Sequence, residues 1–347
     1  MKRIFLWVFL FVIVILVVST ASAHTPLGGL TVAVSPDDKT IVTGGDNRVL
    51  YVMDAKSLKI TKRIWLKTTI WGLHFNKDGS RLLVEDTEKT ISFVDTKTWK
   101  VEKEVRKAGY LIPAMEANLF AAVNSKKKKI MFMSMDDGSL KGKVVLDKYV
   151  AAFGINAKGD RLAVLSKDEK DADEKVVKSG DIPKDLKGAD RIEFKQRNDG
   201  KTSIFYIFNI PSGKELLRKK IYFKTSTGSR VLFDGKAILV LNYKNENARV
   251  ESKGEPRMFQ LLNSYNYGIG LSGNQKFVCS GGLANGTYTK VKGLESKAFK
   301  IDRMPGWPEY FKGFAFDSKG NAYGTTSGYR IIKIKPDGTV EKEVPVY

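Results

Sequence analysis

A short polar turn between two apolar segments recurs along this 347-residue chain, and it constrains the fold more than any other feature. In the first copy, at residues 34–45, the turn Ser-Pro-Asp-Asp-Lys separates two strand-like runs, and a glycine pair ends the second run. Apolar runs separated by Asp, Asn, Gly and Pro are typical of antiparallel strands. The chain is therefore predicted to consist of repeated hairpins. Further copies lie at residues 75–84, 155–164, 271–282 and 316–324.

A fixed spacing relates the first units to one another. Asp54, Asp95 and Asp136 each end a third strand-like segment, and successive members are 41 residues apart. A period near 40 residues in a strand-rich sequence indicates propeller blades of four antiparallel strands. Seven such units can be marked out between residues 24 and 347. The sequence therefore predicts an all-β, seven-bladed β-propeller.

The first 23 residues have the three parts of a secretory signal peptide. A positive start, Met-Lys-Arg, is followed by an unbroken apolar run at residues 4–18 and by small residues up to Ala23. The alternative is an uncleaved anchor, although a spanning helix needs roughly 20 apolar residues. We expect a periplasmic or secreted protein that meets a membrane only through an uncleaved signal segment.

Charge and cysteine content limit the partners and the chemistry. Without Lys2 and Arg3, the chain has 57 Lys and Arg against 38 Asp and Glu, an excess of +19. Outside the cytoplasm, this charge favours a protein partner or an anionic envelope polymer over nucleic acid, and the alternative is a dispersed solubility charge. The single cysteine, Cys279, excludes an internal disulfide and a thiolate metal cluster.

A highly charged segment, residues 166–201, interrupts the fourth unit between its second and third strands. It is expected to emerge on the rim that carries the connections between blades, as a flexible loop or as a lid or docking arm. The alternation in residues 191–195 predicts an extra hairpin within it. A polar loop is expected at residues 244–256, and the lysine run at 126–129 is expected to form a hairpin loop.

Several units open with an aromatic residue where the chain enters the innermost strand. These positions lie beside the central channel, so their side chains are candidates for a collar around a ligand or a partner residue. The alternative is that they wedge neighbouring blades together. Arg230 has the equivalent place in the fifth unit, where it is a candidate for pairing with an anionic group. The predicted collar consists of Trp71, Tyr110, Tyr149, Arg230, Tyr267, Trp307 and Tyr310.

Catalytic residue sets are weakly represented. Two histidines leave little room for a Ser-His-Asp system or a histidine-bound metal. After signal cleavage, His24 and the new amino terminus would have the groups that chelate copper, but an N-terminal histidine also arises by chance, and no metal site or cofactor is predicted. A calcium site of the lactonase type remains an alternative, formed by Glu85, Glu116, Asp234 and Glu309 at the channel.

The repeats resemble the WD40-like and YVTN-type propellers of exported bacterial proteins. The resemblance rests on the turns Ser-Pro-Asp-Asp-Lys at residues 35–39, Asp-Gly-Ser at 78–80 and Asp-Thr-Lys-Thr at 95–98. It covers essentially the whole mature chain, although the Trp-Asp and Gly-His pairs of true WD40 repeats are missing. The layout is also similar to a subunit of quinone-cofactor amine dehydrogenases, and that similarity implies a docking scaffold.

These features lead to one main functional hypothesis. The chain is expected to be an exported, non-catalytic propeller that binds a partner through its loop-rich face. Two alternatives remain open: a channel-mouth hydrolase or oxidoreductase, and a scaffold subunit of a periplasmic redox complex.

Overall fold

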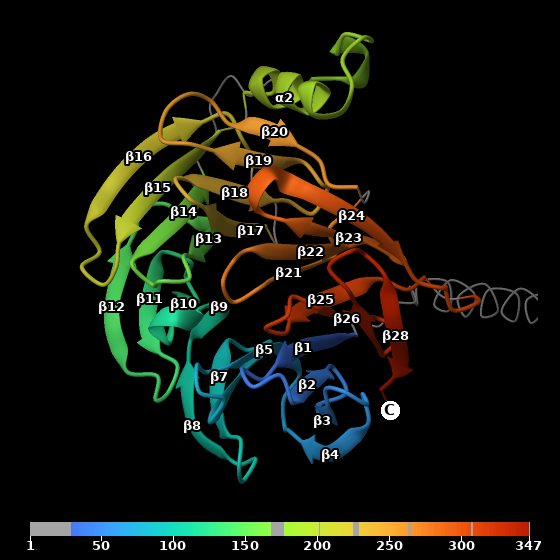
Figure 1. The fold of residues 1–347 in the computed structure, drawn as a ribbon. Helices are drawn as coiled ribbons and strands as arrows, with labels where there is room; N and C mark the ends of the chain where they lie inside the picture. The colour runs from blue at the N-terminus through green and yellow to red at the C-terminus, as the bar shows by residue number, and fades with distance from the viewer. Residues whose placement is uncertain are drawn as a thin grey trace, which may run out of the picture.

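The structure, a computed structural model, describes residues 29–167, 177–200, 202–224, 229–262, 265–306 and 308–346. Within these ranges, seven sheets of four antiparallel strands form a ring (Figure 1). The predicted seven-bladed β-propeller is therefore confirmed. The predicted signal peptide and His24 lie outside the described residues.

Each blade is formed by four strands that are consecutive in the chain, ordered from the channel outward. Blade one comprises β1 (Leu30–Val34), β2 (Thr40–Gly45), β3 (Val49–Asp54) and β4 (Ile60–Trp65). Blade two comprises β5 (Ile70–Phe75), β6 (Arg81–Asp86), β7 (Thr90–Asp95) and β8 (Val101–Arg106). Blade three comprises β9 (Ala108–Ala114), β10 (Leu119–Asn124), β11 (Lys129–Ser134) and β12 (Leu140–Val145).

The remaining blades follow the same order. Blade four comprises β13 (Val150–Ile155), β14 (Arg161–Lys167), β15 (Ser203–Asn209) and β16 (Glu215–Ile221). Blade five comprises β17 (Arg230–Asp234), β18 (Ala237–Leu241), β19 (Asn247–Val250) and β20 (Arg257–Phe259). Blade six comprises β21 (Gly268–Leu271), β22 (Phe277–Gly281), β23 (Asn285–Lys290) and β24 (Glu295–Lys300). Blade seven comprises β25 (Phe311–Phe316), β26 (Ala322–Thr326), β27 (Arg330–Ile334) and β28 (Val340–Pro345).

This topology gives the ring two different edges. One edge, called here the linker rim, carries the segments between consecutive blades and the loops between second and third strands. The opposite edge, the turn rim, carries the turns between first and second strands and between third and fourth strands. Every innermost strand therefore starts at the linker rim and ends at the turn rim.

Burial changes systematically from the channel to the periphery. All five residues of β18 are buried, because the second strand of a blade is covered by the neighbouring blades on both faces. The outer strands β4 and β8 are mostly exposed and rich in charged residues. Charged side chains on an edge strand discourage pairing with another chain. The hydrophobic core therefore lies between blades and ends at the fourth strands.

The tight turns are built by the residues that signalled them in the sequence. One carboxylate oxygen of Asp95 accepts the backbone N–H of Thr98 at 2.7 Å, and Asp54 accepts that of Ser57 at the same distance. An acidic side chain that bonds to the backbone two or three residues on stabilises such a turn. Gly79 supplies the positive φ of 77° that the neighbouring turn requires.

Hydrogen bonds join blades along the turn rim. They connect the turns after the innermost strands to one another or to another blade, and so fix this edge of the ring. One of them, from Gln275 of blade six to Ile155 of blade four, skips blade five. The pairs are Ser318 N–Asp38 at 2.9 Å, Lys77 N–Asn118 at 3.0 Å, Glu116 N–Ala157 O at 3.1 Å, Gln275 Nε2–Ile155 O at 2.6 Å, Phe233 N–Gln275 at 3.2 Å and Tyr288 OH–Gly320 O at 2.6 Å.

Among the strands of the described ranges, none is exchanged between blades seven and one, and packing closes the ring there. β1 lies against β25 and β26 (Figure 1). Lys342 Nζ also donates to the carbonyl of Ser57 at 2.7 Å, and the Tyr329 hydroxyl donates to Asp46. One apolar cluster spans the junction and includes Leu30, Val32, Ile41, Tyr51 and Met53 from blade one and Tyr323, Ile331 and Val346 from the C-terminal end.

The described part of the charged insert, residues 177–200, is docked on the ring. The hairpin predicted for residues 191–195 is wrong, because this segment lies within helix α2 (Gly188–Asn198), which packs beside β20 (Figure 1). Ile192 and Gln196 are four residues apart, so they lie on the same face of the helix, and both are buried. Ser166 and Lys167 belong to β14, so the insert starts later than predicted. None of the described helices is long and apolar enough to cross a bilayer.

The polar loop predicted at residues 244–256 is only partly correct. It contains β19, the third strand of blade five, in which Ala248 and Val250 are buried against neighbouring strands. Only these two apolar side chains alternate with polar ones, which is a weak strand signal. By contrast, residues 126–128 of the lysine run lie in the hairpin connection between β10 and β11, as predicted, and Lys129 is the first residue of β11.

The closure of the ring by packing makes a stability prediction. Ile331 is the second residue of β27 and is fully buried at the junction of blades seven and one. Ile331→Ala should lower the free energy of unfolding by about 2–5 kcal/mol, because it removes buried methyl groups and leaves a cavity. Urea titration would measure this change.

Ile130→Ala is the matched control, because Ile130 is the second residue of β11 and is also fully buried, away from the junction. The two losses should be similar if the junction is packed as tightly as an ordinary interface between blades. A negligible effect of Ile331→Ala beside a large effect of Ile130→Ala would contradict closure by packing.

Candidate functional site

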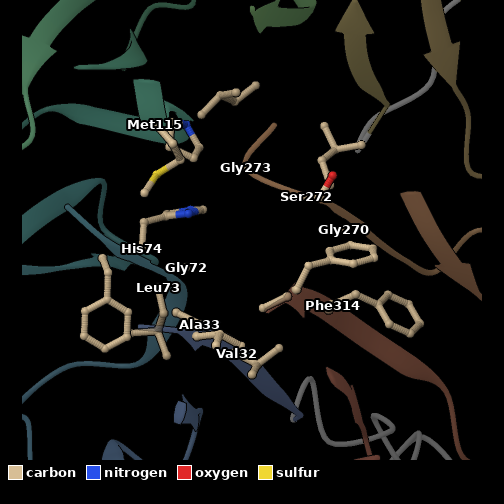
Figure 2. Close-up of a pocket in the computed structure, with 18 of the residues that line it drawn as sticks. Val32, Ala33, Gly72, Leu73, His74, Met115, Gly270, Ser272, Gly273 and Phe314 are labelled. Carbon is tan, nitrogen blue, oxygen red and sulfur yellow. The ribbon is translucent and has the colours of Figure 1, made fainter. Parts of the chain in front are cut away.

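The central channel contains a cavity of about 570 Å³. The innermost strands β1, β5, β9, β17, β21 and β25 all contribute to its wall. Figure 2 shows His74 and Met115 on one side of this cavity and Ser272 and Phe314 on the other. Its volume lies within the roughly 300–1,000 Å³ that is typical of small-molecule sites.

Register shifts at the linker rim place several residues at the mouth of the channel. β5, β9, β13 and β25 each have a bulge near their first residues. Trp71, Tyr110 and Lys312 are left out of the ladder at three of these bulges, and all three line the cavity. A bulge redirects a side chain and often marks a functional site. The sequence alone gave no signal for these shifts.

Glu85 fixes the wall between blades two and three. Its carboxylate accepts the backbone N–H of Leu111 at 3.0 Å and that of Tyr110. Tyr110 has a φ of 57°, a conformation that a tyrosine rarely adopts, and these hydrogen bonds hold the backbone there. Burial raises the pKa of the Glu85 carboxyl, while the two N–H groups oppose that shift.

Arg230 begins β17 in blade five and lines the cavity. Its charge acts on Glu85 and on His74, which both belong to blade two, on another side of the ring. The guanidinium therefore extends into the channel. Burial lowers the pKa of Arg230, and the negative charge of Glu85 counteracts that effect. Within the described part of the chain, no carboxylate lies within 4.0 Å of the Arg230 guanidinium.

His74 is a neutral side chain at physiological pH. Burial, and secondly the positive charge of Arg230, lower its pKa to about 4. The imidazole lies in β5 and lines the cavity opposite Phe314 (Figure 2). It contributes hydrogen-bonding capacity to the channel without adding a charge.

Four tyrosines form a contiguous cluster on the linker rim of blades five to seven. The ring centroids of Tyr267 and Tyr310 are 4.7 Å apart, and those of Tyr243 and Tyr267 are 4.8 Å apart in an edge-on arrangement. Tyr265 contacts both Tyr243 and Tyr267. Tyr265 is 44% exposed and Tyr267 is 38% exposed, so the cluster presents aromatic surface to solvent.

Buried asparagines hold the base of this tyrosine cluster. Asn266 Nδ2 donates to the carbonyl of Asn242 at 2.7 Å, and the backbone N–H of Asn266 donates to the carbonyl of Tyr243 at 2.8 Å. Asn247 Nδ2 donates to Asn245 at 2.7 Å, and Asn245 in turn bonds both backbone groups of Leu261. Side-chain amides that replace missing backbone partners keep an irregular loop in one conformation.

The aromatic residues of blades three and four lie beneath lysines. Lys127 Nζ is 5.1 Å from the ring centroid of Tyr110, and Lys128 Nζ is 5.0 Å from that of Tyr149. Such cation–π contacts contribute about 0.5–1 kcal/mol at an exposed site. Tyr149 is 57% exposed and does not line the cavity.

The predicted collar is thus divided into three groups. Trp71, Tyr110 and Arg230 line the cavity, Tyr267 and Tyr310 belong to the tyrosine cluster, and Tyr149 stands apart beneath Lys128. Trp307 lies outside the described residues. The predicted collar does not include Tyr243, which immediately precedes the polar loop predicted at residues 244–256. The asparagines at positions 242, 245 and 247 were the available signal that this loop has internal structure.

The four carboxylates considered for a calcium site have separate environments. Arg330 Nε donates to Glu309 at 2.8 Å in a buried ion pair, and Arg249 pairs with Asp234. Glu85 is occupied by backbone N–H groups, whereas Glu116 lies at the turn-rim end of the cavity. Across the part of the chain described here, no three His, Cys, Asp or Glu side chains converge as a metal-ligand set.

Comparison with known proteins identifies a shared fold. No protein-family model matches the sequence, and no curated protein sequence matches it. The β-propeller domain of Cps50 (Swd1) from Myceliophteria thermophila superimposes with a TM-score of 0.57 at 12% identity, over 86% of this chain and 94% of that one. A Kuenenia stuttgartiensis hydrazine synthase chain gives a TM-score of 0.57 at 15% identity, over 92% and 96%. These likenesses show the β-propeller fold.

The environment of His74 makes a prediction about pH. Its pKa is about 4 in the fold against 6.5 for the free side chain, so the unfolded chain binds a proton first as the pH falls. The stability that neutral His74 maintains is complete above pH 6.5 and is lost as the pH falls toward 4. The loss should amount to about 3 kcal/mol, at 1.4 kcal/mol per pKa unit.

Urea titrations of the protein and of a His74→Gln variant at pH 7 and pH 4 would measure this contribution. The variant should lose less stability between the two pH values than the unsubstituted protein does. An equal loss in both proteins would show that His74 does not titrate in this range.

Proposed function

We propose that this protein is an exported, non-catalytic binding module that holds an acidic protein partner on its linker rim. The β-propeller fold is commonly used as a binding scaffold, and its rim loops are the elements that vary with function. The observation that carries the proposal is the exposed tyrosine cluster, which faces the same rim as the lysine-covered tyrosines of blades three and four.

The tyrosine cluster has the properties of an interface anchor. Tyrosine supplies a large contact area with few rotatable bonds, and a hydroxyl that can reach a partner. Burial, followed by a hydrogen bond with Tyr267, raises the pKa of the Tyr243 hydroxyl, so this hydroxyl stays uncharged at physiological pH. Residues of this kind are enriched among those that dominate binding energy.

Positive charge on the linker rim favours an acidic partner. Lys126, Lys127 and Lys128 lie in one connection of blade three, and the mature chain has an excess of +19. Such a field accelerates association with a negatively charged surface and weakens as salt increases. An anionic envelope polymer would meet the same charges, but it would not need the aromatic cluster.

The described part of the insert adds to this rim. Helix α2 is attached to blade five through Ile192 and through Gln196, whose Nε2 donates to Glu246 at 3.3 Å. Val177 N donates to Asp199 at 2.7 Å and ties the insert to the end of the same helix. Residues 177–200 of the insert therefore supply a fixed, highly charged surface beside the rim, and we assign them to the docking face.

A binding role is preferred to a channel-mouth enzyme because the candidate carboxylates already have partners. Glu309 and Asp234 are in ion pairs with arginines, and Glu85 accepts two backbone N–H groups. The redox-scaffold alternative needs a partner of its own, and the capture experiment below would reveal it.

The proposed export rests on the signal peptide predicted for the first 23 residues of the sequence. Mass spectrometry of the protein recovered from its native cells should give a chain that begins at His24. A chain that retains residues 1–23 would instead indicate an anchor, and recovery from the cytoplasm alone would overturn the proposed export.

Substitution of the tyrosine cluster should abolish partner capture. A Tyr265→Ala, Tyr267→Ala double variant removes the two most exposed rings of the cluster and should weaken capture at least tenfold, because anchor residues often contribute 2 kcal/mol or more. Affinity capture from an envelope extract, followed by quantitation of the recovered partner, would measure the loss.

Tyr222→Ala is the matched control, since Tyr222 is 46% exposed but follows the outer strand β16 and is outside the cluster. This control should retain capture, and raising the salt concentration should weaken capture by the unsubstituted protein. Equal recovery by the double variant and the control would contradict a partner site at the tyrosine cluster.

A further inference from the structure

We infer that the central channel is a binding site for a small monoanion, a carboxylate joined to an apolar body, and that Arg230 binds the carboxylate. This site lies inside the ring and is separate from the partner surface proposed for the linker rim.

Arg230 is a cation placed in a concave site. It lines the cavity, and in the described part of the chain no carboxylate forms an ion pair with its guanidinium. Burial of such a group is unfavourable unless an anion compensates it. A guanidinium presents parallel N–H donors that match the two oxygens of a carboxylate.

Three of the four acidic side chains of the wall, Glu85, Asp38 and Asp317, are already engaged, and the fourth, Glu116, lies at the turn-rim end. The oxygens of Glu85 accept the N–H groups of Tyr110 and Leu111. Asp38 accepts the backbone N–H of Ser318 at 2.9 Å, and Asp317 accepts that of Asn321 at 2.8 Å. These carboxylates are therefore not arranged to form a bidentate pair with the guanidinium.

The charges along the cavity give it a direction. Arg230 and Lys312 are at the linker-rim end, where they exceed the single charge of Glu85 by one. Asp38, Glu116 and Asp317 lie at the turn-rim end, where Lys77 is the cation of the wall. An anionic group is therefore favoured only near Arg230, and a net excess of one charge suits a monoanion.

The deeper part of the cavity suits an apolar body. Ile112, Ile269 and Leu271 are partly exposed and line the wall below Arg230. Met115 reaches across from blade three, because a Cβ added to Gly273 of blade six would lie 3.1 Å from its Cγ. This contact narrows the turn-rim end. Burying each methylene of a ligand here would contribute about 0.8 kcal/mol.

The open end lies at the linker rim. Trp71 lines the cavity there and is 58% exposed, so its side chain is accessible from solvent. A ligand would enter past Trp71 and Tyr110 with its apolar body first, and its carboxylate would stop at Arg230.

Isothermal titration calorimetry with sodium decanoate and with decanol tests this site. The unsubstituted protein should bind decanoate at least tenfold more tightly than decanol, which has the same chain without the charge. Arg230→Gln should reduce this preference to about twofold or less, whereas Arg218→Gln, on the exposed outer strand β16, should leave it unchanged. Arg230→Lys keeps the charge and should keep part of the preference.

A second variant tests the channel itself. Ile269→Trp fills the apolar part of the cavity and should weaken binding of both probes at least tenfold, and it provides the test if Arg230→Gln does not fold by circular dichroism. The inference is overturned if decanoate binds no better than decanol. It is also overturned if Arg230→Gln preserves the preference or if Ile269→Trp leaves both affinities unchanged.

The partner surface on the linker rim and the anion site in the channel can be tested independently. The Tyr265→Ala, Tyr267→Ala double variant should still bind decanoate, because neither residue lines the cavity. Arg230→Gln should still capture the protein partner.

Discussion

Burial of both faces of every four-stranded sheet against its neighbours is the constraint on which this structure depends. A single blade leaves residues such as Leu50, Ile91, Ile130 and Ile331 without cover, and each of these is fully buried in the ring. They occupy the same position, the second residue of a third strand, in four different blades. Closure between blades seven and one repeats this packing, and no strand in the described part of the chain is exchanged there.

The two edges of the ring follow from the same arrangement but have different properties. On the turn rim, short turns are joined by hydrogen bonds. The side-chain amide of Gln275 donates to the carbonyl of Ile155 and accepts the backbone N–H of Phe233. The linker rim carries the longest connections of the ring, residues 168–202, 222–229, 260–267 and 301–310. The inner strands β5, β9, β13 and β25 have bulges near their starts on this rim. Fixed turns on one edge allow the other edge to carry exposed aromatic residues and lysines, since the sheets are already held in place. Binding surface and structural support are thus separated.

Much of the fold could be predicted from the sequence because turn chemistry is local. The residue types and spacing of Asp54, Asp95 and Gly79 predicted the turns in which they lie. The structure shows the corresponding hydrogen bonds and dihedral angle. The hairpin predicted for residues 191–195 was wrong, because alternation over only five residues does not distinguish a strand from a helix. The candidate site was less predictable. The charge of Glu85 in blade two acts on Arg230 in blade five only because the ring brings both residues to the channel, and no local sequence pattern predicts this proximity.

Amide hydrogen exchange tests the closed ring most directly, because it reports the opening free energy of each strand. The account predicts that β1 and β25, on either side of the closure, exchange only when the whole protein unfolds, with the same free energy as β13, which lies between blades that are consecutive in the chain. Rapid exchange of β1 or β25 beside a protected β13 would contradict it, because the ring would then open at its junction without unfolding.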